Sequence, residues 1–544
     1  MTSPFASKLR TNYCPSDEEV AEIKALLVEP CLRLKGLDDK ITALQKALDK
    51  LTQERDSLEA YVQAHTALIS PSRRLPLDII QEIFVACLPT HRNCVMDARE
   101  APVLLGRLCS SWRAVSLSTP RLWASLHVVD VGRLAPVHDS SSRRLEERAA
   151  LIPEVTRTWL GRSGQCPLSV SLYTFPFPSD PVAPTILETL IQVAPRWQHI
   201  QFTIPAAFLD TQFQLAAKDV PILKSIALHQ YDPFQVPNLA WDRLEVLRGS
   251  NVTGVAISGC DLVLPRLPLR WTELTALSTL GSRDSPVSGE RHISSQEAME
   301  LISKCPQLRT LSVLFEEHGL FAETEAHPIV HPLLQTFHCR GNVSTFTFLP
   351  GCLSLPELKE FTFLVHLPGS DAYMDDENGR PLVRFLAASS HLESLHIGIS
   401  QFSSSFLQEI LRSFPPTLQR LRINAMSKIM WGARLGSSLD DAILSVITPG
   451  LGDAAPCPCP ALKELQIDRC TAISDSALLQ FISARAATLK RIQVDFAREV
   501  ELDIRPSLQP FIETGLDICI THVRPTRKVS AWEGLPHAER PLLD

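Results

Sequence analysis

The chain has little of what a disulfide-bonded, membrane-spanning or nucleic-acid-binding protein needs. Its 14 cysteines in 544 residues are about 2.6% of the chain, far below the content of a disulfide scaffold. No apolar run approaches the roughly 18–20 residues that cross a bilayer, and residues 1–8 lack the apolar segment of a secretory signal. A formal net charge of -7 argues against nucleic acid as a partner, because such binding needs a basic patch. We therefore expect no membrane contact, no nucleic-acid contact, and a cytoplasmic or nuclear location.

The sequence also lacks the short motifs of common catalytic sites. It has no phosphate-binding Gly-x-x-x-x-Gly-Lys-Ser/Thr loop, no His-Glu-x-x-His pair and no Gly-x-Ser-x-Gly elbow. Cys457 and Cys459 form a close pair, but a zinc site would need a second pair. The acidic segment 369–379 lacks the closing Glu of a calcium loop. We expect no enzyme activity, no cofactor and no metal, while a catalytic set assembled from distant segments stays an open alternative.

Residues 20–66 are predicted to form a helix with a heptad seam. Nine seam residues alternate in steps of three and four, as in a coiled coil: Leu34, Leu37, Ile41, Leu44, Leu48, Leu51, Arg55, Leu58 and Val62. Pro30 should interrupt the helix before this seam, because proline lacks the N–H that an interior helical residue donates. The seam predicts a coiled coil, either a homodimer through residues 32–62 or a pair with another protein. The alternative is a single helix that folds back along the rest of its own chain.

The segment after residue 70 has the apolar pattern of two short helices. Pro76 suits the first turn of a helix, since its missing N–H would have no intrahelical partner there. Apolar residues then recur at helical spacing, at Ile79, Ile80, Ile83, Phe84 and Cys87 and again at Leu104, Leu105, Leu108, Trp112 and Val115. Two helices of this size cannot bury both stripes within themselves. Apolar surface is therefore left for a partner or for the rest of the chain.

This segment resembles an F-box, the module that docks on the Skp-type adaptor of a cullin–RING ubiquitin ligase. The resemblance covers residues 70–127 and lies in the order Leu75-Pro76, Ile79-Ile80-x-x-Ile83-Phe84, Cys109-x-x-Trp112-Arg113 and Leu122-Trp123. The link at 88–102 is longer and more polar than is usual in the family. The resemblance implies a buried Cys109 and adaptor contacts at Leu75, Pro76, Ile79, Ile80, Ile83, Leu108 and Trp112. The alternative is an ordinary helical hairpin with two packed tryptophans.

From about residue 140 the chain carries repeated Leu-x-x-Leu-x-Leu-like runs. They lie at 197–202, 223–228, 244–247, 308–313, 392–397, 418–423, 462–467 and 489–494. A strand and a helix of this size cannot bury their apolar faces alone, so the copies stack into a curved solenoid. The run from Leu462, with Cys470 where Asn or Cys closes the turn, resembles the cysteine-containing leucine-rich repeat of many F-box proteins. A helical-repeat or mixed α/β body is the alternative.

The predicted fold is α/β, with a helical segment at 1–69, an F-box at 70–130, an irregular leucine-rich-repeat solenoid at 140–523 and a flexible tail at 524–544. The resemblance implies a substrate-recognition subunit of a Skp–cullin–F-box type E3 ubiquitin ligase, whose partners are the Skp-type adaptor and an unknown protein substrate. Side chains between the core leucines should line the concave strand face and bind that substrate: Arg309, Ser312, His396, Arg422, Gln466 and Asp468. The alternative is a non-catalytic scaffold that uses the coiled coil and the repeat surface without assembling a ligase.

Overall fold

The chain divides into two compact units, Met1–Ile83 and Phe84–Asp544. The computed structural model describes residues 3–69, 74–129, 142–174, 182–205, 208–209, 213–230, 241–259, 263–280, 292–315, 329–341, 351–365, 374, 377, 379–425, 428–430, 433–435, 439–450 and 457–522. The domain boundaries expected at residues 69 and 130 stay predictions. The tail at 524–544 and most of the acidic segment 369–379 lie outside the described residues.

The first unit consists mainly of one 52-residue helix, α1 (Asp17–Leu68). Ser16 caps it: its Oγ accepts from the N–H of Glu19, and the Glu19 carboxylate accepts from the N–H of Ser16. Lys8 Nζ adds an ion pair to Glu19 Oε1 at 2.7 Å. The expected interruption at Pro30 is wrong, because the helix continues through it. Proline removes one backbone hydrogen bond, but the turns on both sides of it stay helical here.

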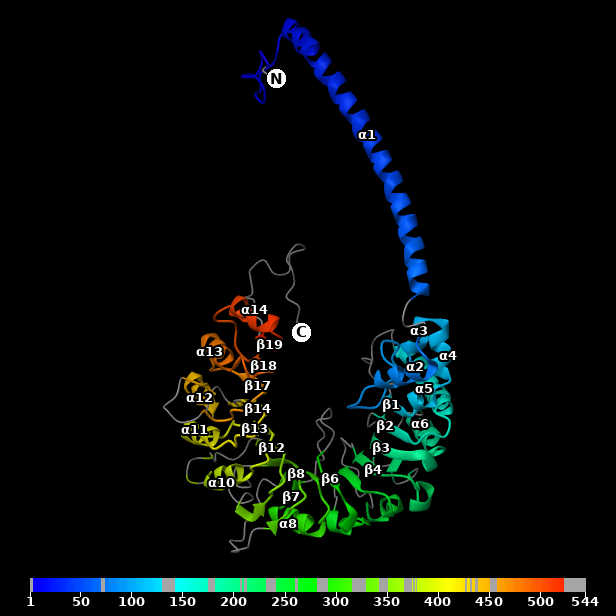
Figure 1. Ribbon diagram of the computed structural model, residues 1–544, viewed down its shortest axis with the longest axis vertical. Coiled ribbons are helices and arrows are strands. Elements are labelled where there is room, and N and C mark those ends of the chain that lie inside the picture. The colour runs from blue at the N-terminus through cyan, green and yellow to red at the C-terminus, as the bar shows by residue number, and fades with distance from the viewer. Residues whose placement is uncertain are drawn as a thin grey trace. The chain divides into compact units, whose positions relative to one another are not determined.

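The second unit is built on one 15-stranded parallel sheet that curves, with helices on its outer side (Figure 1). Fourteen strands follow one another across the sheet: β1 (Ser125–Val129), β2 (Leu168–Tyr173), β3 (Trp197–Ile204), β4 (Ser225–Gln230), β5 (Gly254–Ser258), β6 (Ala276–Ser278), β8 (Thr310–Phe315), β10 (Thr336–Gly341), β12 (Glu360–Val365), β13 (Ser394–Gly398), β14 (Arg420–Asn424), β17 (Glu464–Cys470), β18 (Arg491–Phe496) and β19 (Asp517–His522). The short β7 (His292–Ile293) pairs with β8. The chain is therefore an α/β solenoid preceded by a long helix.

The outer layer changes along the solenoid. Its helices are α5 (Ser142–Arg162), α6 (Val182–Ile191), α8 (Ser295–Lys304), α10 (Arg380–Ala388), α11 (Ser404–Arg412), α12 (Asp441–Val446), α13 (Asp475–Arg485) and α14 (Arg505–Glu513). Between β3 and β6, the described residues form mainly short 3₁₀ turns: η4 (Ala217–Asp219), η5 (Trp241–Arg243), η6 (Glu245–Arg248), η7 (Leu264–Arg266) and η8 (Trp271–Glu273). Two small ladders, β9 (Ile329–Val330) with β11 (Leu353–Ser354) and β15 (Lys428–Met430) with β16 (Ala433–Leu435), stand apart from the main sheet.

The core is made of side chains that repeat at the same register position on successive strands. One row, at most 2% exposed, is Leu311, Phe337, Phe361, Leu395, Leu421, Leu465 and Ile492. A second lies two residues further along each strand: Val313, Cys339, Phe363, Ile397, Ile423, Ile467 and Val494. Burying each large apolar side chain contributes about 1.5–3 kcal/mol. Stacking of repeats therefore supplies the core that no single repeat could form.

Seven of the eight predicted runs contain a strand of this sheet, and one does not. The run at 244–247 belongs to the turn η6, and the next strand, β5, begins only at Gly254. Leu244 and Leu247 are buried all the same, because residues three apart share one side of a 3₁₀ turn. Their spacing could not distinguish a strand from this turn.

The predicted docking segment forms short helices, as expected, but with one break. The first is α2 (Leu77–Ala86), which spans the division between the two units. The predicted second helix is in fact two, α3 (Leu105–Leu108) and α4 (Ser110–Leu117), because Cys109 between them is extended. Cys109 is exposed, so its predicted burial is wrong. Its Sγ accepts a hydrogen bond from the N–H of Trp112 and so caps α4.

The long polar segment between α2 and α3 joins the sheet. Val95 makes a parallel bridge to His127 on β1. The Asn93 side chain reaches across two strands, since its Oδ1 accepts from Ser125 Oγ at 2.9 Å and from Ser169 Oγ at 2.7 Å. The long polar link at 88–102 is therefore a segment that closes the first end of the solenoid.

Candidate protein-binding surfaces

Most of the predicted adaptor-binding residues lie exposed. Leu75 is 37% exposed, Ile79 44%, Ile83 42% and Leu108 58%, and Pro76 is exposed as well. Ile80 and Trp112 are partly buried. Ile79 and Ile83 are four residues apart on α2 and share one face of that helix. Large aliphatic side chains exposed on short helices are typical of a protein-binding site.

The helices that carry Leu108 and Trp112 rest on a packed base. The Trp112 ring lies 4.9 Å from the ring of Phe84, which is fully buried. Arg113 Nε donates to the carbonyl of Gly106 at 2.8 Å and ties α4 to α3. Leu108, the last residue of α3, is therefore exposed on a helix whose position is fixed by its hydrogen bond to α4.

A second aromatic contact ties this base to the solenoid. The buried Trp123, in η2 (Pro120–Trp123), packs edge-on against Trp159 of α5 at 4.8 Å. Its Nε1 donates to the carbonyl of Ser116 on α4 at 2.8 Å, and the guanidinium of Arg162 lies over its ring. Trp123 is thus a packing residue. Trp112 is only partly buried, so part of its side chain is accessible to a partner protein.

The concave face is the face of the sheet opposite the helices, and strand register fixes which side chains line it. One cross-strand row reads His127, Ser171, Gln201, Ala227, Ala256, Ser278, Ser312, His338, Thr362, His396, Arg422, Gln466, Gln493 and Cys519. Four of the six predicted substrate residues, Ser312, His396, Arg422 and Gln466, fall in this row. Arg309 precedes β8, and Asp468 lies two residues beyond Gln466. Ser312 is only 9% exposed and offers little surface.

The C-terminal part of this face contains a shallow charged hollow. It measures about 250 Å³, and His396, Arg422 and Gln466 all line it. Arg422 Nε lies 2.8 Å from Asp468 Oδ2, so two of the predicted residues form an ion pair. A neighbouring row alternates in charge through Arg420, Glu464, Arg491 and Asp517. Side chains of both signs at fixed spacing suit a polar protein surface better than a small apolar ligand.

The N-terminal part contains a larger hollow of about 510 Å³. Its lining includes Arg92, His127, Tyr173 and Gln201. Arg92 makes a two-pronged ion pair with Glu100, with its closer contact at 2.6 Å. That pair neutralises the guanidinium, so this hollow presents mainly neutral polar groups. The sequence interpretation had assigned no residue to it.

Histidine–serine pairs recur along the N-terminal strands and were missed in the sequence. In each, a histidine Nδ1 lies within hydrogen-bond distance of a serine Oγ directly opposite on the next strand: His127 with Ser171 at 2.8 Å, His199 with Ser225 at 2.7 Å and His229 with Ser258 at 2.9 Å. Burial lowers the pKa of all three, and lowers that of His229 to about 4. All three imidazoles are therefore neutral at physiological pH. Only strand register brings each pair together, so spacing along the chain gave no sign of them.

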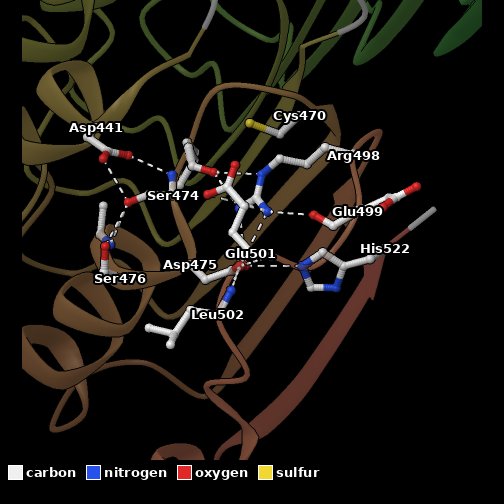
Figure 2. Close-up of polar contacts among 12 residues, drawn as sticks. Asp441, Cys470, Ser474, Asp475, Ser476, Arg498, Glu499, Glu501, Leu502 and His522 are labelled. Carbon is white, nitrogen blue, oxygen red and sulfur yellow. Dashed lines mark hydrogen bonds and ion pairs between the residues drawn. The ribbon is translucent and has the colours of Figure 1, made fainter. Parts of the chain in front are cut away.

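The most extensive polar network surrounds the buried carboxylate of Asp475 in the last repeats (Figure 2). Arg498 donates to both carboxylate oxygens at 3.1 and 3.3 Å, and His522 Nε2 lies 3.1 Å from Oδ1. The N–H groups of Glu501 and Leu502 each donate to Oδ2 at 2.9 Å. Burial alone would raise the pKa of Asp475, but these hydrogen bonds outweigh it and hold the pKa well below its usual range.

The geometry of this network is that of a structural lock. Asp475 is the first residue of α13, Arg498 follows β18 and His522 ends β19, so one carboxylate joins three elements. The neighbouring Ser474 hydroxyl caps α13 and donates to Asp441 Oδ2 at 2.7 Å. The hydroxyl proton of Ser474 is therefore already used in a hydrogen bond to Asp441. The side chain of Asp475 is fully buried. The network fastens the final strands and has no exposed nucleophile.

Two observations bear on metals and membranes. Among the described residues, no group of three His, Cys, Asp or Glu side chains is placed to hold a metal ion. Cys459 is buried, and burial raises the pKa of its thiol to about 12, so this member of the close pair stays protonated. Among all the residues that the structure describes, no helix is both long enough and apolar enough to cross a membrane.

Comparisons with known proteins say little about this chain. No family model matches this sequence, and no curated protein matches it. Among solved structures, the chain is similar to one in "Crystal structure of Rad7 and Elc1 complex in yeast", with 13% identity and a TM-score of 0.33. The match covers 77% of this chain and 92% of that chain. A similarity this low carries no argument about what the present chain binds.

Proposed function

We propose that this chain is the substrate-recognition subunit of a Skp–cullin–F-box type ubiquitin ligase and is itself without catalytic activity. In this proposal, residues 70–130 form an F-box that docks a Skp-type adaptor, and the solenoid is an irregular leucine-rich-repeat domain. The chain would hold its substrate beside a charged conjugating enzyme and so raise the local concentration of the two. Its place of action would be the cytoplasm or the nucleus.

The observation that carries the proposal is the exposure of aliphatic side chains in the F-box-like segment. Ile79, Ile83 and Leu108 lie at the positions where the resemblance puts adaptor contacts, and each is more than 40% exposed. Exposed aliphatic groups on ordered helices lose contact with water when a partner covers them, and a few such anchors dominate the energy of an interface. Phe84 and Trp123, by contrast, are buried and hold the segment together.

The concave face is the surface that we assign to the substrate. Arg422, Gln466 and His396 lie together in the charged hollow of its C-terminal part. Arg309 and Asp468 flank this row rather than belong to it. Because the hollow is shallow and bears both signs of charge, we propose a folded or extended protein segment of mixed charge as its ligand.

The decisive experiment is adaptor capture with the full chain. Ile79→Arg combined with Leu108→Arg should lower affinity for a purified Skp-type adaptor by more than about a hundredfold, because several apolar anchors are replaced by charges. The matched control is Leu151→Arg on α5, where a leucine of similar exposure (60%) lies outside the F-box-like segment. This control should bind the adaptor as the unmodified chain does.

All three substituted residues, Ile79, Leu108 and Leu151, are exposed, so the variants should fold. Circular dichroism and the urea midpoint should be the same for the double variant and the control. Failure of the unmodified chain to bind the adaptor, under conditions where an established F-box binds, would contradict the proposal. Equal binding by the double variant would contradict the assigned contacts.

The alternative is a non-catalytic scaffold that never assembles a ligase. The observation that favours it is the long helix α1, whose seam residues are exposed and could recruit a partner without any adaptor. Adaptor capture separates the two functions, because a scaffold would show no adaptor binding in either the unmodified chain or the control.

A further inference from the structure

The heptad seam of α1 is exposed from Leu34 to Val62, whereas Val20, Ile23 and Pro30 nearer the start of the helix are half-buried. Its eight aliphatic residues between Leu34 and Val62 are 52% to 69% exposed. In proteins, most of the stability of a helix comes from packing of its apolar face and little from intrinsic propensity. A helix of 52 residues with an uncovered apolar seam therefore calls for a partner of matching length.

The seam is longer than the sequence interpretation assumed. Because α1 continues through Pro30, the residues before it stay in the same helical frame. Val20 and Leu27 then take the heptad position of Leu34, while Ile23 and Pro30 take that of Leu37. The seam thus runs from Val20 to His65 with three imperfect positions, Pro30, Arg55 and His65.

We propose that α1 pairs with α1 of a second copy of this chain, as an antiparallel coiled coil in which Asp17 of one helix lies opposite Leu68 of the other. In this register, the numbers of two facing core residues add up to 85. The overlap extends over the full helix, Asp17–Leu68. A shift by one heptad in either direction would leave one turn or more of seam uncovered at each end. The proposal does not depend on the proposed ligase function.

The core layers of this register are complementary. Five layers bring aliphatic pairs together, and each occurs twice by symmetry: Ile23 with Val62, Leu27 with Leu58, Leu34 with Leu51, Leu37 with Leu48 and Ile41 with Leu44. A sixth layer places Pro30 opposite Arg55, and the outermost layer places Val20 opposite the imidazole of His65. Pro30 and Arg55 therefore meet each other, and the third imperfect position lies at the end of the coil.

The charges beside the seam are also matched. Each heptad has two core residues, such as Leu34 and Leu37. In an antiparallel pair, the residue before the first core residue faces the equivalent residue of the partner. The residue after the second core residue likewise faces its equivalent. This register brings Arg33 of one copy beside Glu54 of the other, and Lys24 beside Glu59. Symmetry doubles both ion pairs. Like charges do not face each other at these flanking positions.

The parallel arrangement is less favourable. It stacks Arg55 on Arg55 in the core and places Glu54 beside Glu59, both repulsive. It retains an attraction between Arg33 and Asp38. Its other attraction, between Glu19 and Lys24, competes with contacts that Glu19 already makes with Lys8 and with the cap of the helix.

The test uses the unmodified full chain. Sedimentation equilibrium should give twice the chain mass at micromolar concentration. A carbodiimide, which joins amines directly to carboxylates, should then link Lys24 to Glu59, identified by mass spectrometry of the digested dimer. Within one helix these residues are 35 positions apart, about 53 Å at 1.5 Å per residue. The link can therefore form only between two antiparallel copies.

Two variants control the experiment. Leu44→Asp buries a charge in the seam and should raise the dimer dissociation constant by more than about a hundredfold. The adjacent Ala43→Asp lies off the seam and should leave the dimer intact. Glu59→Gln should abolish the link without dissociating the dimer, since it removes one flanking charge only.

A monomer at all concentrations would overturn the proposal. A dimer linked between Lys24 and Glu19, without the link to Glu59, would overturn the antiparallel orientation. A dimer that survives Leu44→Asp would show that the seam is not the interface. Adaptor binding by the Leu44→Asp monomer reports on the ligase function alone, so the failure of one proposal is distinguishable from the failure of the other.

Discussion

The two parts of the concave face share one backbone plan and differ in chemistry. From β1 to β6 the cross-strand rows hold mainly serine, alanine, glycine and histidine, and three of the histidines pair with serine on the next strand. From β12 to β19 the rows carry arginine, glutamate and aspartate. The same register therefore presents a neutral, hydrogen-bonded surface at one end and an ion-paired surface at the other.

This difference implies that the two parts respond to different conditions. Neutral imidazoles with lowered pKa values make the N-terminal part sensitive to acid, because their protonation is favoured only in the unfolded chain. Exposed ion pairs make the C-terminal part sensitive to salt, which screens them. The Asp475 network belongs to the C-terminal part but is buried, so screening should hardly affect it.

The largest effect is expected at this network. Asp475→Asn leaves Arg498 and His522 without their anion, and breaking a buried charge pair costs about 3–5 kcal/mol in the free energy of unfolding. The matched control is Asp468→Asn, since that residue pairs with Arg422 at the surface and should cost at most about 1 kcal/mol. Urea unfolding at neutral pH measures both. Equal losses in the two variants would contradict the assignment of Asp475 as the lock of the last strands.

A second effect should appear on acidification of the N-terminal part. The pKa of His229 falls from an ordinary 6.5 to about 4 on folding. Between these values the unfolded chain binds more protons than the folded chain, so stability is complete above pH 6.5 and is lost as the pH falls toward 4. A shift of this size corresponds to roughly 3 kcal/mol.

The measurement is the urea midpoint between pH 7 and pH 4, for the unmodified chain and for His229→Asn. The asparagine keeps a side chain that can hydrogen-bond to Ser258 on the next strand but does not titrate. Its pH profile should be flatter. His127 and His199 stay in both proteins and shift in the same direction, so some slope should remain. Identical profiles would show that His229 does not cause the acid sensitivity.

The smallest effect is expected at the surface ion pair of Arg422 and Asp468. Arg422 is 44% exposed and Asp468 19%, so Arg422→Gln should cost about 0.2–1 kcal/mol at low salt. At 1 M salt, where charges are screened beyond about 3 Å, the loss should shrink. Gln201→Ala in the N-terminal hollow provides the comparison, since its effect on the urea midpoint should be independent of salt. A salt-independent loss at Arg422 would remove the contrast between the two parts.

The sequence predicted the seven strands that begin inside its Leu-x-x-Leu-x-Leu-like runs, and it missed strands such as β2, whose leucines follow another spacing. The strands β10 and β12 escaped notice because Phe337, Cys339, Phe361 and Phe363 occupy the two core positions there. These side chains fill the same rows as aliphatic residues, so the fold accepts them although the leucine pattern does not. The opposite error occurred at Leu244, where the pattern is present but the chain forms a turn.

The candidate surfaces were predictable to the extent that they depend on local spacing. The exposed residues of α2 follow from helical periodicity, and alternation along a strand places Ser312, Arg422 and Gln466 on one face. Burial of Cys109 was expected only from the F-box resemblance, whereas the extended backbone at this residue makes its thiol the cap of α4. Contacts such as those of Asp475 and His229 depend on which strands become neighbours, and the chain does not encode that in any short stretch.

The segment around Asn93 has a consequence for how this chain can associate. A parallel sheet ordinarily ends in a strand whose outer amide and carbonyl groups invite a foreign strand to add on. At β1 that position is already taken, because the N–H of His127 donates to the carbonyl of Cys94 at 2.7 Å and Asn93 satisfies two neighbouring hydroxyls. A strand of another molecule therefore cannot pair with β1 and extend the sheet. Pairing at exposed edge strands is a common route to fibres, and this end of the sheet is protected from it.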